Sequence, residues 1–160
     1  VASLGLSDKV AEIVNKSTYL KKLGGTLAYL LAGIFAILKN KPNSLTLMVD
    51  DQSIGELHIN LLAIANGNYF GGGMKIAPHA QLDDGLFDVI ILEELNRFEL
   101  LTNNPKVYFG GHLKHKKVKS LRAKSIKIHS NEVLRIETDG EPIGFTEASF
   151  EVLSGVLKII

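Results

Sequence analysis

Two long apolar runs, at residues 57–65 and 86–92, are joined by a segment with three consecutive glycines and two adjacent carboxylates. Continuous apolar runs of this length, bounded by turn-forming residues, are typical of strands buried on both faces. The joining segment, residues 66–88, is a shaped connection between them. Functional residues often lie on such connections, so this segment is the first place to look for a site.

Shorter strand patterns surround these runs. Residues 45–49 precede a polar segment at 50–55 that predicts a hairpin connection into the first long run. Residues 125–130 and 133–138 alternate apolar and polar side chains, which indicates half-solvated strands. Asp139-Gly140 then predicts a tight turn, and residues 148–160 predict a closing hairpin.

Helical patterns occur at three places. Ser7 is a candidate N-cap for a short helix that includes Val10 and Val14. Residues 23–38 lack any charge, but they fall short of the ~20 residues that span a membrane, so a buried helix at about 26–38 is expected. Asn96 predicts the N-cap of one further short helix.

These elements predict a mainly β fold: a two-layer antiparallel β-sandwich with an N-terminal helical segment and one short additional helix. At 160 residues and 46% hydrophobic content, residues 1–160 are expected to form a single domain. The absence of cysteine excludes disulfide and zinc-thiolate scaffolds and is compatible with the cytoplasm.

Three local patterns could carry chemistry, and each also has a purely structural interpretation. Gly71 to Gly73 could bring backbone amides to an anion, but a bend is the stronger interpretation. Asp83-Asp84 could hold Mg²⁺ or Ca²⁺, or simply cap a solvated turn. Glu141, beside the Asp139-Gly140 turn, could accept a proton from an attacking hydroxyl, although hairpin tips routinely carry such residues.

A basic stretch, residues 112–129, contains seven Lys or Arg and no acid. It lacks the interleaved aromatic residues of single-strand binders, so no nucleic-acid partner is predicted. A face toward anionic lipid, a nucleotide or solvent stays open.

Taken together, the motifs resemble the second domain of the bacterial diacylglycerol kinase family of lipid kinases. Their order and distances fit that family over essentially the whole chain. The residues that carry the resemblance are Ser3-Leu4-Gly5, Asn66-Gly67, Gly71-Gly72-Gly73-Met74, Ala77-Pro78, Leu82-Asp83-Asp84-Gly85-Leu86-Phe87-Asp88, Val107 to His112 and Asp139-Gly140-Glu141-Pro142.

The resemblance implies a C-terminal β-sandwich that closes over an N-terminal nucleotide-binding domain. The Gly-Gly-Asp-Gly-Thr signature of that domain is not in this sequence, so we expect the chain to be one half of a larger protein. In the family's pattern, Glu141 matches the general base and Asp139 its acidic neighbour. Asp84 matches the side-chain ligand of Mg²⁺, with Gln81 and Leu86 at the positions that supply backbone carbonyls.

The implied reaction transfers the γ-phosphoryl group of ATP to diacylglycerol, forming phosphatidic acid, at the cytoplasmic membrane surface. Mg²⁺ and ATP are the implied cofactors. Two alternatives stay open: a non-catalytic lipid- or partner-binding domain, and a kinase acting on sphingosine-like or phosphatidylglycerol-like lipids. Exposed strand edges also allow a homodimer.

Overall fold

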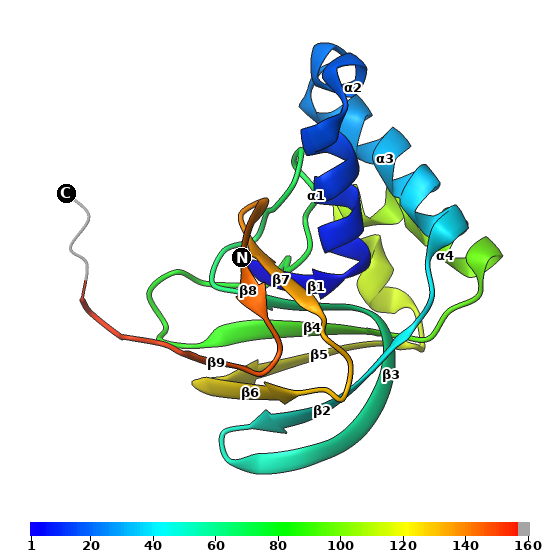
Figure 1. Cartoon of the computed structure of the whole chain (residues 1–160). Coiled ribbons are helices and arrows are strands. Elements are labelled where there is room, and N and C mark those ends of the chain that lie inside the picture. Colours follow the sequence, from blue (N-terminus) through cyan, green and yellow to red (C-terminus); the bar gives the residue numbers. More distant parts are fainter. Residues whose placement is uncertain (157–160) are drawn as a thin grey trace.

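The structure, a computed structural model, describes residues 1–156, with only the backbone described at Lys21. In this part a curved antiparallel sheet carries a layer of helices on one side (Figure 1). The strands are β1 Ala2–Gly5, β2 Asn43–Val49, β3 Gln52–Ala65, β4 Phe87–Glu93, β5 Val118–Ala123, β6 Ser125–His129, β7 Arg135–Thr138, β8 Glu141–Phe145 and β9 Ala148–Glu151. The helices are α1 Leu6–Lys16, α2 Thr18–Lys22, α3 Gly25–Lys39 and α4 Arg97–Asn103, followed by the short 3₁₀ helices η1 Pro105–Phe109 and η2 Gly111–Lys114.

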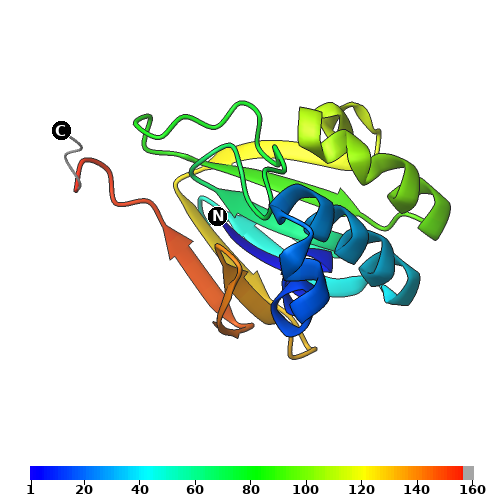
Figure 2. The same cartoon turned by 90° about the horizontal axis from the view of Figure 1, so that it is seen from above.

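The sheet is continuous, and β3 is the strand that joins its parts. The order runs β8-β7-β1-β3-β2-β6-β9, while β4 pairs with β3 and carries β5. Figure 2 shows α1, α3 and α4 lying over this sheet. The predicted mainly β, antiparallel fold with an N-terminal helical segment is confirmed, and its layers are parts of one hydrogen-bonded sheet.

Side chains of β3 point alternately into two hydrophobic cores. Leu61, Ala63 and Ala65 contribute to the core beneath the helices. Leu62 and Ile64 contribute to the core on the opposite face of the sheet. Because alternate residues of a strand point to opposite faces, a strand covered on both sides is apolar at successive positions. The apolar residues 61–65 have this origin. Earlier in the predicted run, His58 is exposed, and the buried Asn60 accepts a hydrogen bond from the Leu95 amide.

The first helix begins at a glycine rather than at the predicted serine. Gly5 is the N-cap of α1 with a φ of 88°, and a Cβ at this position would lie 2.5 Å from the Asn60 carbonyl oxygen. Only glycine tolerates both the positive φ and the close approach. The prediction of Ser7 as N-cap is therefore wrong: Ser7 lies in the first turn, buried beside Val10.

The uncharged segment forms α3, as predicted, but the expectation that this helix is buried is wrong for one face. Its buried face carries small residues, among them Ala28, Ala32 and Ala36. Phe35 and Leu38 are exposed. Among the described residues, no helix is long and apolar enough to cross a membrane.

Several strand boundaries differ from the prediction. The connection after β2 is a two-residue turn, Asp50-Asp51, and the rest of the predicted loop extends β3. Strands β1, β5 and β8 were not anticipated. The segment at 148–160 does not fold back on itself within residues 148–156, because β9 pairs with β6; residues 157–160 lie outside the described part. Asn96 caps α4 through a capping box with Glu99, as predicted.

Candidate functional site

The turn between β7 and β8 presents Glu141 at the end of the sheet. Asp139 and Gly140 both have positive φ, 50° and 89°, and Thr138 pairs directly with Glu141 across the hairpin. Two central residues with positive φ match the hairpin turn whose twist suits antiparallel strands, and Asp-Gly is a favoured sequence there. The predicted tight turn is confirmed.

Two side chains hold the backbone of this turn. Glu137 is buried, accepts a hydrogen bond from the Gly140 amide at 2.6 Å and accepts another from the Ser3 hydroxyl. Asn15 on α1 donates to the Gly140 carbonyl at 3.1 Å. Burial raises the pKa of Glu137, against the hydrogen bonds from Ser3 and Gly140, which lower it. The backbone of Gly140 is thus fixed on both its amide and carbonyl sides.

Sequence reasoning missed Glu137. Alternation along β7 places Ile136 in the core on one face of the sheet and Glu137 on the opposite face, beneath the helices. Both residues are buried because both faces of the sheet are covered. A charged residue in an alternating strand pattern normally faces solvent, so nothing in the residue pattern announces a buried acid.

The predicted base and its neighbour are solvent-accessible. Glu141 is exposed, and within the described part of the chain its carboxylate has no hydrogen bond or ion pair. Asp139 is exposed as well, with Oδ1 at 2.8 Å from the backbone nitrogen of Val1. The Glu141 carboxylate is therefore accessible to a hydroxyl-bearing ligand.

The three glycines form a bend that packs against Tyr29. Phe70 and Met74 exchange backbone hydrogen bonds of 3.0 Å around Gly71 to Gly73, all of which have positive φ. A Cβ on Gly71 would lie 2.7 Å from the Tyr29 ring. The interpretation as a bend is confirmed.

Tyr29 also approaches the β7–β8 turn. A Cβ on Gly140 would lie 3.8 Å from the Tyr29 hydroxyl oxygen. The Tyr29 pKa is raised, first by burial and then by the charge of Glu137. The glycine bend, Tyr29 and the β7–β8 turn therefore meet in one place.

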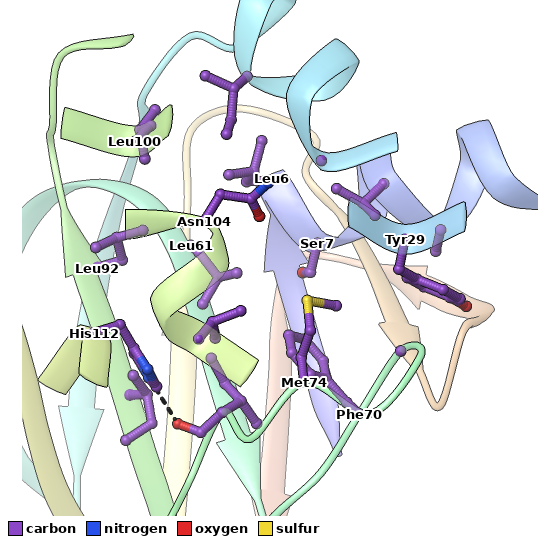
Figure 3. A pocket seen from close by; sticks show the side chains of 18 of the residues that line it. Leu6, Ser7, Tyr29, Leu61, Phe70, Met74, Leu92, Leu100, Asn104 and His112 are labelled. Atoms are coloured by element: carbon purple, nitrogen blue, oxygen red, sulfur yellow. Dashed lines mark hydrogen bonds between the residues drawn. The ribbon is translucent and has the colours of Figure 1, made fainter. Parts of the chain in front are cut away.

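A largely apolar cavity of about 100 Å³ lies between the helices and the sheet (Figure 3). Glu137 and Gly140 belong to its wall, so the cavity reaches the β7–β8 turn. Its apolar lining comes from α1, α3, β3, β4, α4 and the glycine bend, and includes Leu6, Val10, Ile37, Leu61, Phe70 and Met74. By the same measure one water needs about 10–15 Å³, so the cavity has room for a chain of several methylene groups.

Two buried polar atoms in the cavity wall have no hydrogen-bond partner, Ser7 Oγ and His112 Nδ1. The other ring nitrogen of His112 lies 3.0 Å from the Ile76 carbonyl oxygen (Figure 3). Burial lowers the pKa of His112, so the ring is neutral, with Nε2 donating and Nδ1 free to accept. The cavity therefore offers a hydroxyl and one acceptor in otherwise apolar surroundings.

The predicted metal turn lies at the start of β4. Asp84 is half-buried; its Oδ1 accepts a hydrogen bond from the Leu86 amide at 2.9 Å, and its Oδ2 is paired with Arg122 on β5. Asp88 is buried close by, with Oδ2 lacking a hydrogen-bond partner and its pKa raised by burial. Gln81 is exposed.

These residues fit a magnesium ion in donor chemistry. Mg²⁺ prefers oxygen ligands, keeps several waters and needs only one or two carboxylates. Asp84, with the backbone carbonyls of Gln81 and Leu86 assigned by the resemblance, would be an all-oxygen set. Arg122 already neutralises Asp84, so an ion there would compete with the guanidinium. No cluster of three or more His, Cys, Asp or Glu side chains suited to a metal occurs among the described residues.

The two predicted turns lie at the same end of the sheet without adjoining. Thr138, Ala2, Ile64 and Val89 are consecutive register partners across β7, β1, β3 and β4. β7 and β4 are therefore three strand spacings apart, roughly 14 Å along the sheet.

The basic stretch is partly neutralised by its neighbours. Lys119 pairs with Glu93, and Lys127 pairs with Asp51 at 2.8 Å. Arg122 pairs with Asp84. A stretch with these internal partners presents less free positive charge than its sequence suggests.

Comparisons with known proteins identify relatives of this chain. The family model described as the YegS C-terminal NAD kinase beta sandwich-like domain matches residues 1–160. A diacylglycerol kinase from Staphylococcus haemolyticus (strain JCSC1435) is 36% identical over 132 residues, which are 82% of this chain and 39% of that protein. A protein named "Probable lipid kinase YegS-like" from Stenotrophomonas maltophilia (strain K279a) is 30% identical over 160 residues, 99% of this chain and 51% of that protein.

Solved structures show the same fold. A crystal structure from Bacillus anthracis str. Sterne matches with a TM-score of 0.70 and 25% identity, covering 96% of this chain and 49% of that one. A structure of a diacylglycerol kinase from the same organism matches with a TM-score of 0.60 at 20% identity, covering 96% and 46%.

The matched segments span between 39% and 51% of the length of these relatives. The resemblance to the C-terminal domain of the bacterial lipid kinases is confirmed. The chain belongs to the family of YegS C-terminal NAD kinase beta sandwich-like domains.

Proposed function

We propose that this chain is the acceptor-binding half of an ATP-dependent lipid kinase that phosphorylates diacylglycerol to phosphatidic acid. The observation that carries the proposal is the apolar cavity, whose wall includes Glu137 and Gly140 of the β7–β8 turn. An acyl chain in this cavity would bring the lipid hydroxyl toward Glu141. The curated relatives named diacylglycerol kinase support the same substrate class.

In the proposed reaction Glu141 acts as the general base. Its carboxylate accepts the proton of the lipid hydroxyl as the hydroxyl oxygen bonds to the γ-phosphorus of ATP. The bond from that phosphorus to the bridging oxygen breaks, and ADP leaves. Phosphoryl transfer depends mostly on positioning and charge neutralisation, which fits a base whose turn is fixed by Glu137 and Asn15.

Mg²⁺ at Asp84, when bound, would supply positive charge at the end of the sheet. Because the base belongs to a turn three strands away along the sheet, we infer that this ion would order the contact with the nucleotide-binding half. The residues proposed to hold it are Asp84 with the carbonyls of Gln81 and Leu86. Asp139 is proposed as the acidic neighbour whose negative charge contributes to the electrostatic potential at Glu141.

The direct test is an assay of the full-length protein with labelled ATP against a lipid panel. The panel contains diacylglycerol, sphingosine, phosphatidylglycerol and glycerol without acyl chains. Transfer to diacylglycerol with none to glycerol supports the proposal. Preferred transfer to sphingosine or phosphatidylglycerol would support the related kinase, and transfer to glycerol alone would refute the lipid assignment.

The role of the cavity can be tested through acyl-chain length. Ala11 lines the cavity and is buried, so Ala11→Leu should shorten the space for a chain. We expect the ratio of kcat/KM for long-chain over dioctanoyl diacylglycerol to fall about tenfold, since each buried methylene contributes about 0.8 kcal/mol. A general loss of stability would lower both rates together and leave their ratio unchanged. An unchanged ratio would therefore contradict the cavity's role in binding the acyl chain.

For the 160-residue chain alone, a non-catalytic binding role is the second candidate. The chain corresponds to 39% of the Staphylococcus haemolyticus kinase, so more than half of such a protein lies outside it. Calorimetry of the isolated chain with ATP tests this role. ATP binding with a Kd in the micromolar range would show that the nucleotide site is not confined to the other half.

A further inference from the structure

The outward face of α3 carries large apolar side chains where a surface helix usually carries polar ones. Leu27, Ile34, Phe35 and Leu38 are each between 36% and 56% exposed. The inward face is built from small residues, including Ala32 and Ala36. An amphipathic helix of a soluble protein has the reverse arrangement, with the large apolar residues inward. This outward α3 face, defined by the four exposed residues, is therefore an interaction surface.

Positive charge surrounds the outward α3 face. From residue 13 to residue 49 the sequence has five lysines and no acid. Lys22, Lys39 and Lys41 are exposed at the two ends of α3, and none of them forms an ion pair within the described residues. Lysines near an anionic membrane surface are attracted to it. The combination of apolar side chains and flanking lysines is complementary to a bilayer that contains anionic lipid.

The opposite side of α3 serves the proposed site. Tyr29, Gly33 and Ile37 line the cavity, and Tyr29 approaches the β7–β8 turn. Successive residues of an α-helix are turned by about 100°. Tyr29 therefore points away from the side occupied by Leu27, Ile34 and Leu38. Figure 1 shows α3 at the outer edge of the helical layer.

This orientation helps to decide whether the nucleotide-binding half or a lipid surface occupies the outward α3 face. The nucleotide-binding half must deliver ATP at the β7–β8 turn, on the side of α3 to which Tyr29 points. A partner on the outward α3 face meets neither polar side chains nor acids on the helix, and finds only apolar groups between lysines. A lipid surface needs no polar complement, so it fits this face better than a protein domain does.

We propose that the outward α3 face docks the protein on a bilayer containing anionic lipid, with Leu27, Ile34, Phe35 and Leu38 inserted among the lipids and Lys22, Lys39 and Lys41 at the headgroups. The inference rests on the proposed function in that a lipid substrate must be reached at a membrane. It goes beyond that function by assigning the contact to α3 rather than to the basic stretch at residues 112–129.

The experiment is vesicle sedimentation of the full-length protein without ATP, using phosphatidylcholine vesicles with or without 30% phosphatidylglycerol, roughly a bacterial-like anionic fraction. We expect Phe35→Ser/Leu38→Ser to weaken binding to the anionic vesicles at least tenfold. Lys39→Glu/Lys41→Glu should weaken it similarly on anionic vesicles and little on neutral ones. The matched control is Ile54→Ser/Val133→Ser, which removes two exposed apolar side chains elsewhere and should change binding less than twofold.

The outcomes separate this proposal from its rivals. Wild-type-like sedimentation of Phe35→Ser/Leu38→Ser overturns it. A loss of dimer mass in light scattering for this variant, with unchanged vesicle binding, would assign the face to a second copy instead. A variant that becomes protease-sensitive between its two halves, again with unchanged vesicle binding, would assign it to the other domain. Phosphorylation of soluble dihexanoyl diacylglycerol should persist in the variant, so failure of the kinase proposal and failure of the docking proposal are distinguishable.

Discussion

The two carboxylate turns at one end of the sheet differ in how their charges are satisfied. Asp84 is half-buried and has two internal partners, the Leu86 amide and the Arg122 guanidinium. Glu141 is exposed and lacks any such partner within the described part of the chain. A carboxylate with an internal cation holds its local structure and yields only to a competing cation. A carboxylate without one is available to accept a proton.

The two turns also differ in how firmly other residues hold the backbone, and here the β7–β8 turn is the one with internal partners. Gly140 is held from both sides, by Glu137 at its amide and by Asn15 at its carbonyl. The position of Glu141 is thus set by its backbone while its side chain stays free. At the other turn, the side chain of Asp84 does the holding. A fixed backbone with a free carboxylate favours catalysis, whereas a bound carboxylate favours structure or metal binding.

The largest expected effect comes from removing the free carboxylate. In the full-length protein, Glu141→Gln should lower kcat by about 10²–10⁴-fold, the usual contribution of a general base. The amide cannot accept the proton, yet it keeps the size and exposure of the side chain. Rates of lipid phosphorylation at saturating ATP measure the effect.

Glu132→Gln is the matched control, because Glu132 is also exposed near a strand end but lies outside the β7–β8 turn. Its rate should stay within about twofold of wild type, as is usual for surface substitutions. If Glu141→Gln retained full activity, the assignment of the two turns to different tasks would fail.

A smaller effect is expected at the paired carboxylate. Arg122→Gln removes the cation that competes with Mg²⁺ for Asp84, so the affinity of the full-length protein for Mg²⁺ should rise. If displacing the guanidinium costs roughly 1.4 kcal/mol of binding free energy, the affinity rises about tenfold. Asp84→Asn should lower the affinity. Calorimetric titration with MgCl₂ reads out binding directly. Unchanged affinity in both variants would show that Asp84 serves only to hold the turn.

The smallest effect concerns the residue that fixes the β7–β8 turn. Burial raises the pKa of Glu137 in the folded protein, so ionisation of this carboxyl opposes folding. The wild type should lose stability as pH rises above the unfolded value of about 4.3, and Glu137→Gln, which does not ionise, should escape this loss. The variant's Tm relative to wild type should therefore increase from pH 4 to pH 8.

A pH-independent difference in Tm would instead mean that Glu137 acts only through its hydrogen bonds. Those bonds link the turn to Ser3 on β1. Calorimetric scans of wild type and variant at matched ionic strength distinguish the two cases.

Much of the fold follows from pattern because the pattern has a direct physical cause. The long apolar runs predicted β3 and β4 since both strands face two cores. The Asn96 cap and the Asp139-Gly140 turn depend on local chemistry, so they were predicted correctly. Strand β5 was missed because half of its residues are charged or polar and it forms through pairing with β4, a contact distant in sequence.

The site was less accessible to sequence reasoning. Residue types predicted Asp84 and Glu141 as candidates, and their roles remain proposals. The partners Arg122 and Glu137 depend on strand register and on which faces of the sheet are covered, and no local pattern encodes either. The exposure of Phe35 and Leu38 could not be predicted for a different reason. In a helix without charged residues, the sequence does not indicate which apolar face is covered.

The sharing of β3 between two cores has a consequence for how the chain unfolds. The first half of β3 pairs with β2, and its second half lies between β1 and β4. A loss of order in this one strand would open both cores at once and release α1 and α3 from the sheet. We therefore expect the two layers to melt as a single cooperative unit, with the amides of β3 among the last to exchange with solvent.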